Sequence, residues 1–96
     1  MILYNISIIV EDSSHDDVLA WIKKQLPQLS ADIRLLKMLD SPHEGTTYCL
    51  QITAQDEQAI ASFQEELLPD LQQYIATKHT EKAFIFDSKM QYLSLD

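Results

Sequence analysis

Residues 2–11 alternate between apolar and mixed side chains, and this alternation constrains the fold more than any other feature of the chain. An apolar residue stands at every even position from Ile2 to Val10. Residues 46–54 repeat the pattern, with Leu50 and Ile52 on the apolar side. Successive side chains of a strand point to opposite faces, so a period of two predicts a strand that buries one face. Both stretches therefore predict half-buried β-strands.

Two other stretches carry the three-and-four spacing of apolar residues that is typical of amphipathic helices. The first helix is expected over residues 14–26, with Pro27 discouraging its continuation. The second is expected to begin at Gln55 or Asp56 and to be long. Pro69 lies inside its pattern, so we expect this helix to be kinked or split there.

Two further strands are expected over residues 33–40 and 83–95, and Pro, Gly and Ser in residues 41–45 predict a hairpin loop. The element order is then strand, helix, strand, strand, helix, strand. With right-handed crossovers this order predicts an α+β fold, a ferredoxin-like βαββαβ sandwich. Its four-stranded antiparallel sheet would have the order 4-1-3-2, with two helices on one face. Ninety-six residues suit one domain, 1–96.

Composition argues against several kinds of function. Asp and Glu total 15 against 7 Lys and Arg, a net charge of −8, which disfavours nucleic acid and anionic membranes as partners. The only glycine is Gly45, so no glycine-rich phosphate loop is present. The first residues lack the features of a secretory signal, and one cysteine, Cys49, cannot form an internal disulfide. Together these features favour a cytoplasmic protein with no transmembrane helix.

The sheet face that two helices leave uncovered is the candidate functional surface. It is expected to be apolar in places and small and neutral in its middle, where a solvent-facing sheet usually carries Lys and Glu. On the two central strands this face would consist of Leu3, Asn5, Ser7, Ile9, Thr47, Cys49, Gln51 and Thr53. The edge strands would add either Leu36 and Met38 or Leu35 and Leu39, together with Ile85, Leu93 and Leu95.

Three interpretations of this face remain open. Two copies would form a homodimer by packing their faces together, or a small molecule would bind in a shallow pocket between the sheets, or the face would be solvated. Base stacking on RNA is disfavoured, because the aromatic residues Tyr4 and Tyr48 lie on the apolar side and neither central strand has a Lys or Arg.

Three histidines raise the question of a metal or acid–base site. The topology brings His15, His43 and His79 to one end of the sandwich, with His15 and His43 as the nearer pair. None has the spacing of a metal-binding motif, and all three lie in polar segments typical of a protein surface. We therefore expect no metal and no cofactor. Catalytic residues stay unknown, and the sequence leaves open whether the protein is an enzyme.

Four segments resemble a family of small bacterial domains of unknown function: MILYN at the start, Trp21, TTYCLQITA and LLPDL. Its members share an M-I-x-Y-N start. The resemblance implies a ferredoxin-like fold related to the dimeric α+β barrels, which include oxygenases and proteins with no enzymatic role. It implies no known activity or catalytic residue. The leading hypothesis is a homodimeric interaction or structural domain. The alternative is a small-molecule-binding domain or cofactor-independent enzyme, with a cleft that Asn5, Trp21 and Tyr48 would line.

Overall fold

The two alternating stretches form the central strands in the computed structural model, which describes residues 1–29, 31–42 and 44–96. β1 (Ile2–Val10) and β3 (Thr46–Ala54) pair antiparallel along their whole length. In β1 the even-numbered side chains from Tyr4 onward are buried, and the odd-numbered ones are only partly buried. The period of two therefore arises because one face of the strand packs in the core.

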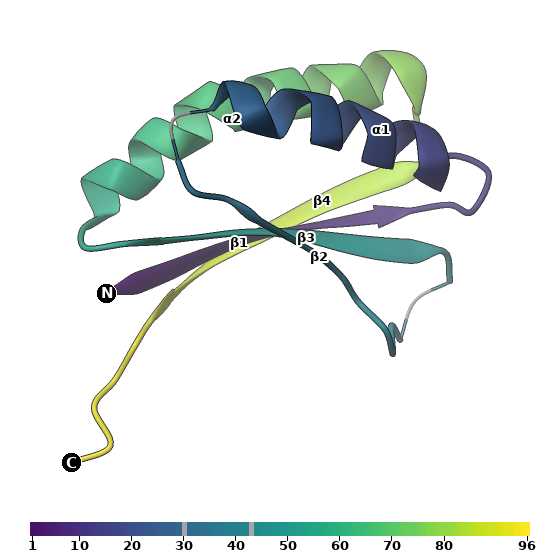
Figure 1. Cartoon of the computed structure of the whole chain (residues 1–96). Helices are drawn as coiled ribbons and strands as arrows, with labels where there is room; N and C mark the ends of the chain where they lie inside the picture. The colour runs from purple at the N-terminus through teal and green to yellow at the C-terminus, as the bar shows by residue number, and fades with distance from the viewer. Residues whose placement is uncertain (30, 43) are drawn as a thin grey trace.

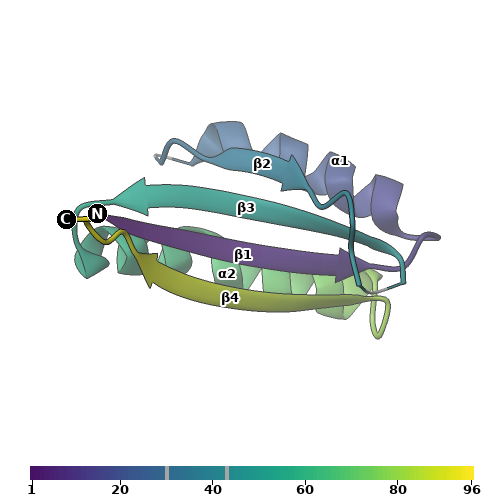
Figure 2. The same cartoon turned by 90° about the horizontal axis from the view of Figure 1, so that it is seen from below.

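Two edge strands complete the sheet. β2 (Arg34–Lys37) pairs with β3, and β4 (Ala83–Gln91) pairs with β1, both antiparallel. The spatial order is β2-β3-β1-β4, which Figure 2 shows from below. This is the predicted 4-1-3-2 order, and the α+β ferredoxin-like fold class is confirmed.

Both helices lie on the same face of the sheet (Figure 1). α1 (His15–Gln25) continues into a short 3-10 turn, η1 (Leu26–Gln28). α2 (Glu57–Lys78) begins after its N-cap residue, Asp56. The Asp56 carboxylate accepts a hydrogen bond from the Ala59 N–H at 3.0 Å. The helices bury one apolar stripe each. These stripes consist of Val18, Ile22, Ile60, Phe63, Leu67, Leu71 and Ile75.

Of the two outcomes expected at Pro69, a kink or a split, the split is wrong, because α2 is continuous through the proline. Proline removes one backbone donor, which leaves the carbonyl of Glu65 without its usual partner. Both residues are exposed, so water can hydrate that carbonyl on the outer side of the helix. The buried stripe lies on the other side of α2 and continues on both sides of the proline.

Both edge strands are shorter than predicted, because their partners end. The Met38 N–H still donates to the Thr47 carbonyl at 2.9 Å, but β3 begins at Thr46, so β2 has little left to pair with. At the other edge, β1 begins at Ile2, and just before it the Met1 carbonyl accepts from the Tyr92 N–H at 3.0 Å. β4 therefore ends at Gln91. Among the described residues, no helix has both the length and the apolar character needed to cross a membrane.

Candidate functional site

The helices leave one face of the sheet uncovered, and we call it the open face. The strand registers place all eight residues predicted from the central strands on it, together with residues from both edge strands. The open face consists of Leu3, Asn5, Ser7 and Ile9 from β1, Thr47, Cys49, Gln51 and Thr53 from β3, Arg34 and Leu36 from β2, and Phe84, Phe86, Ser88 and Met90 from β4.

The register decides which side chains of the edge strands face outward. Leu36 lies opposite Cys49 on the open face, whereas Leu35 packs against the core, so the first of the two predicted alternatives for the second strand is the observed one. The prediction for Ile85 is wrong. Ile85 lies opposite the buried Ile8 and packs against the core.

Two phenylalanines take the place on the open face that was expected for Ile85. Phe84 and Phe86 are 55% and 60% exposed. The stretch AFIF (83–86) is apolar at both odd and even positions, so alternation does not show which of its side chains face the helices. Only the pairing with β1 decides this. Leu93 and Leu95 lie beyond the end of β4 and are outside the sheet.

Cross-strand neighbours divide the open face into apolar ends and a polar middle. The row at one end holds Thr47, Ile9 and Phe84, and the next row holds Leu36, Cys49, Ser7 and Phe86. The polar row holds Arg34, Gln51, Asn5 and Ser88. Beyond it, Thr53, Leu3 and Met90 form a second apolar end.

Side chains in the middle of the open face hydrogen-bond to one another. The Gln51 amide Nε2 donates to Asn5 Oδ1 at 3.1 Å, and Asn5 Nδ2 donates to Ser7 Oγ at 2.9 Å. Ser7 Oγ lies 3.7 Å from Cys49 Sγ. Burying a polar group is costly only when it lacks a partner. Another surface can therefore cover Asn5, Ser7 and Gln51 at a reduced cost, because these side chains already bond to one another.

The strand positions of the open face carry no carboxylate. Of the 15 Asp and Glu residues in the chain, none lies among the open-face residues, and Arg34 is the only charged residue there. A solvated sheet in a protein of net charge −8 would be expected to show acidic side chains on its bare face. The acidic residues lie instead on the helices, in the segments outside the strands, and at Asp87 on the helix side of β4.

An apolar hollow lies at the Ile9 end of the open face. Its volume is about 580 Å³, and its lining includes Met38, Pro42, Phe84 and Phe86. Met38 and Pro42 belong to residues 38–42, which follow β2 and hang below the sheet on the open side (Figure 1). This overhang explains why Thr47 is buried although it faces away from the helices.

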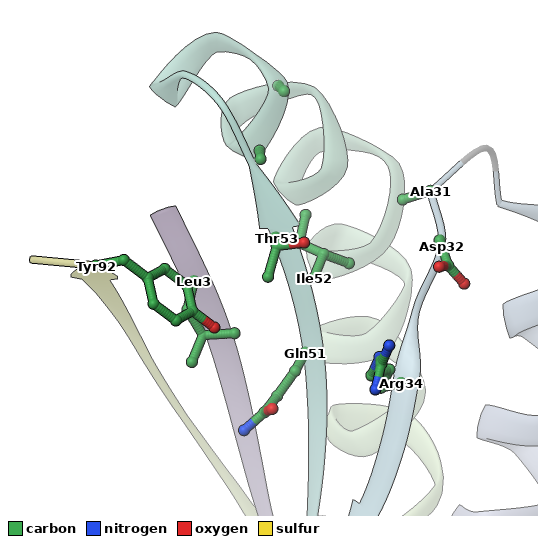
Figure 3. A pocket seen from close by; sticks show the side chains of 10 residues that line it. Leu3, Ala31, Asp32, Arg34, Gln51, Ile52, Thr53 and Tyr92 are labelled. Carbon is green, nitrogen blue, oxygen red and sulfur yellow. The ribbon is translucent and has the colours of Figure 1, made fainter. Parts of the chain in front are cut away.

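A second hollow, of about 470 Å³, lies at the opposite end, along the edge of β3. β2 pairs with β3 only as far as Gln51, so among the described strands none covers the last residues of β3 on that side. Figure 3 shows Arg34, Gln51, Thr53 and Tyr92 around this opening, with Leu3 beside Tyr92. It is more polar than the first hollow.

The molecule has more surface than a compact chain of its mass. A folded monomer of 11.1 kDa is expected to expose about 5,700 Å², whereas this chain exposes 6506 Å², an excess of about 800 Å². Its extents are 45 × 29 × 19 Å. The short dimension fits one layer of helices on one sheet, with no second layer among the described residues on the open face.

The family described as a domain of unknown function (DUF4286) matches residues 1–93. The chain belongs to this family. The match confirms the resemblance to a family of domains of unknown function. Among the curated proteins compared, none matches the chain.

Solved structures share the fold of this DUF4286 member at low sequence identity. A dimeric ferredoxin-like protein from an uncultured marine organism has a TM-score of 0.68 and 9% identity, covering 97% of this chain and 94% of that chain. A Dabb family protein with a ferredoxin-like fold from Mesorhizobium loti has a TM-score of 0.59 and 10% identity, and the match covers 98% of this chain and 100% of that chain. SnoaB, a cofactor-independent oxygenase from Streptomyces nogalater, has a TM-score of 0.56 and 12% identity, and the match covers 97% of this chain and 93% of that chain. At these identities the likeness shows the fold alone.

In the DUF4286 member, the two histidines among the described residues, His15 and His79, contact different tyrosines. His15 Nδ1 lies 3.2 Å from Tyr48 Oη, at the first turn of α1. Burial raises the pKa of Tyr48, and the nearby Asp16 carboxylate raises it further. His43 lies outside the described residues. Within those residues, no group of three or more His, Cys, Asp or Glu side chains is placed to hold a metal ion.

The expectation that His79 is a surface residue is wrong, because it is buried behind the C-terminus of α2. Its Nε2 lies 2.9 Å from Tyr74 Oη, and the Tyr74 hydroxyl donates to the Asp17 carbonyl at 3.2 Å. Because that hydroxyl has only one proton, His79 donates through Nε2. Trp21 stacks on Tyr74 with ring centroids 4.6 Å apart. This cluster joins the two helices.

The cleft suggested for Asn5, Trp21 and Tyr48 is not formed. Asn5 lies on the open face, whereas Tyr48 lies opposite Ile8 and is buried on the helix side of the sheet. Trp21 is engaged with Tyr74 between the helices. The sheet therefore separates Asn5 from the other two residues, and no ligand can touch all three.

Proposed function

We propose that the chain is a cytoplasmic homodimeric interaction domain in which the open face packs against the open face of a second copy. The observation that carries this proposal is the missing carboxylates. A buried, unpaired carboxylate costs several kcal/mol or more, so two acidic chains can stack only through a face that is free of them. In this chain that face is the open face.

The excess surface of the chain is of the size that a stable dimer buries on each copy. Standard interfaces bury about 800 Å² on each partner. That value matches the excess surface of the chain over a compact monomer, about 800 Å². The dimeric ferredoxin-like protein of similar fold supports the proposal by analogy only.

Sedimentation velocity across a wide concentration range tests the proposal. We expect the native chain to sediment as a dimer and the Phe84→Glu variant to sediment as a monomer with nearly unchanged stability, since Phe84 is already half exposed in one copy. Gln72→Glu is the matched control, because it adds the same charge on an exposed position of α2. A native chain that stays monomeric at every concentration rules the proposal out.

A second candidate function is binding of a small apolar molecule between the two sheets. The apolar hollow favours it, since ligand sites commonly have volumes of about 300–1,000 Å³ and apolar linings. The similar fold of a cofactor-independent oxygenase agrees with such a use. Native mass spectrometry of the purified protein distinguishes the two functions. A bound molecule that Phe86→Ser removes supports the second function, whereas a ligand-free dimer contradicts it.

A further inference from the structure

We propose that Leu93 and Leu95, in residues 92–96 of one copy, dock in the apolar hollow of the other copy. The inference rests on the proposed homodimer and names what fills its hollow. It concerns the two overhanging segments of the open face, residues 38–42 and residues 92–96, which lie at opposite ends of the sheet (Figures 1 and 2).

The segment after β4 is apolar and exposed. Leu93 is 79% exposed and Leu95 is fully exposed, and Tyr92 makes the last backbone hydrogen bond to the sheet, donating to Met1. Single exposed leucines are normal, but three large apolar side chains within four residues at the rim of a carboxylate-free face mark an interaction surface.

The segment projects toward the place that a partner would occupy. In Figure 1 it leaves the sheet on the side away from the helices. Two sheets that pack face to face lie about 10 Å apart, and five extended residues span up to about 17 Å. In the proposed dimer residues 92–96 therefore reach the other copy's sheet.

Symmetry selects the part of the partner that the segment meets. The hollow lies at the Ile9 end of β1, and residues 92–96 begin beside Met1 at the other end. A two-fold axis that crosses the strands places each end of one open face over the opposite end of the other. An axis along the strands would instead bring both 38–42 overhangs together and hold the sheets apart there.

The polar row agrees with the axis across the strands. Asn5 and Gln51 lie near the middle of their strands, so that axis stacks the polar row of one copy on the polar row of the other, as an axis along the strands also would, and the overhangs decide between the two. It also stacks apolar ends on apolar ends. The leucines of residues 92–96 then meet a hollow walled by Met38, Phe84 and Phe86, whose chemistry suits them.

Removing the two leucines tests the docking directly. We expect the Leu93→Ser, Leu95→Ser double variant to raise the dimer dissociation constant at least tenfold in sedimentation equilibrium. Its unfolding midpoint at the same low concentration should not change, because both side chains are exposed within one copy. Ser94→Ala is the matched control within the same segment and should leave the dissociation constant unchanged.

Cross-linking between copies identifies the docking position. In a Cys49→Ser background, copies with Leu95→Cys are mixed with copies with Pro42→Cys and oxidised with oxidised glutathione. We expect a disulfide-linked heterodimer, and none when Gln72→Cys, on an exposed position of α2, replaces the Pro42 variant.

The outcomes separate this inference from the proposed function. A dimer that forms normally, ignores the loss of both leucines and gives no selective cross-link overturns the docking and leaves the homodimer standing. A small molecule found in the hollow of an intact dimer overturns the docking as well. A native chain that never dimerises removes both proposals.

Discussion

Two neighbouring isoleucines of β1, Ile8 and Ile9, test whether the helices cover one face of the sheet and a second copy covers the other. Ile8 is fully buried beneath the helices, and Ile9 is on the open face and only partly buried. The same substitution at adjacent positions should therefore have different effects. Ile8→Glu removes about 1.5–3 kcal/mol of apolar burial and adds a buried carboxyl group worth several kcal/mol more. The sum of about 5 kcal/mol or more is comparable to the whole stability of a chain this size, about 5–14 kcal/mol.

Ile9→Glu should instead act on assembly. In a single copy the new side chain points to water, and we expect a loss of stability of about 1 kcal/mol. In the dimer it places one carboxylate from each copy within the apolar contact. We expect the dissociation constant to rise at least a hundredfold, which corresponds to about 2.7 kcal/mol.

Two measurements on both variants separate these effects. Urea unfolding followed by circular dichroism reports stability, and sedimentation equilibrium reports the dissociation constant. We expect Ile8→Glu to be unfolded without urea and Ile9→Glu to be folded and monomeric. Equal unfolding midpoints for the two variants would refute the assignment of the faces, and a folded Ile9→Glu dimer would refute the open face as the contact.

Three further predictions concern the fold. Tyr74→Phe should cost about 1–2 kcal/mol in urea unfolding, because it breaks the hydrogen bonds that join the helices; an unchanged midpoint would contradict this. Gly45→Ala should cost at least about 2 kcal/mol, because Gly45 has φ +86° and a Cβ would lie 2.3 Å from the Val10 carbonyl oxygen; a fully stable variant would contradict it. Burial, and then the hydrogen bond to Asp87, raise the pKa of Tyr4 to about 12, so the neutral phenol is favoured in the fold. The stability that this contributes should be present below pH 10 and be lost as the pH rises from 10 to 12; ultraviolet titration should show Asp87→Asn lowering that pKa.

The sequence predicted the parts of the fold that depend on local pattern. β1 and β3 could be predicted because the even positions of each are apolar, apart from Thr46 in β3, and the element order then left few topologies. The facing of β4 depends on pairing across strands. Phe84, Ile85 and Phe86 are apolar in succession, so only the partner strand decides that Ile85 packs inward. The length of β2 was missed for the same reason, since β3 sets it.

The side-chain clusters were beyond sequence reasoning. His79 lies in a polar segment, and nothing in the spacing shows that Tyr74 packs against it or that Trp21 stacks on Tyr74. The chain of hydrogen bonds from Gln51 to Ser7 likewise depends on the antiparallel register of β1 and β3. The eight candidate residues could be placed on one face from parity. The hydrogen bonds that join Gln51, Asn5 and Ser7 could not be predicted from parity.

This hydrogen bonding explains why the open face is neither a core nor a charged surface. A second fully apolar face would make a single copy prone to nonspecific association and would leave a partner free to slide along the strands. A charged face would repel a second acidic copy. Small neutral side chains that bond among themselves avoid both problems, because they tolerate water in the single copy and would tolerate cover in the proposed dimer. Since the polar row lies across the middle of the strands, it also favours the alignment in which polar meets polar, and the apolar ends then have only each other to contact.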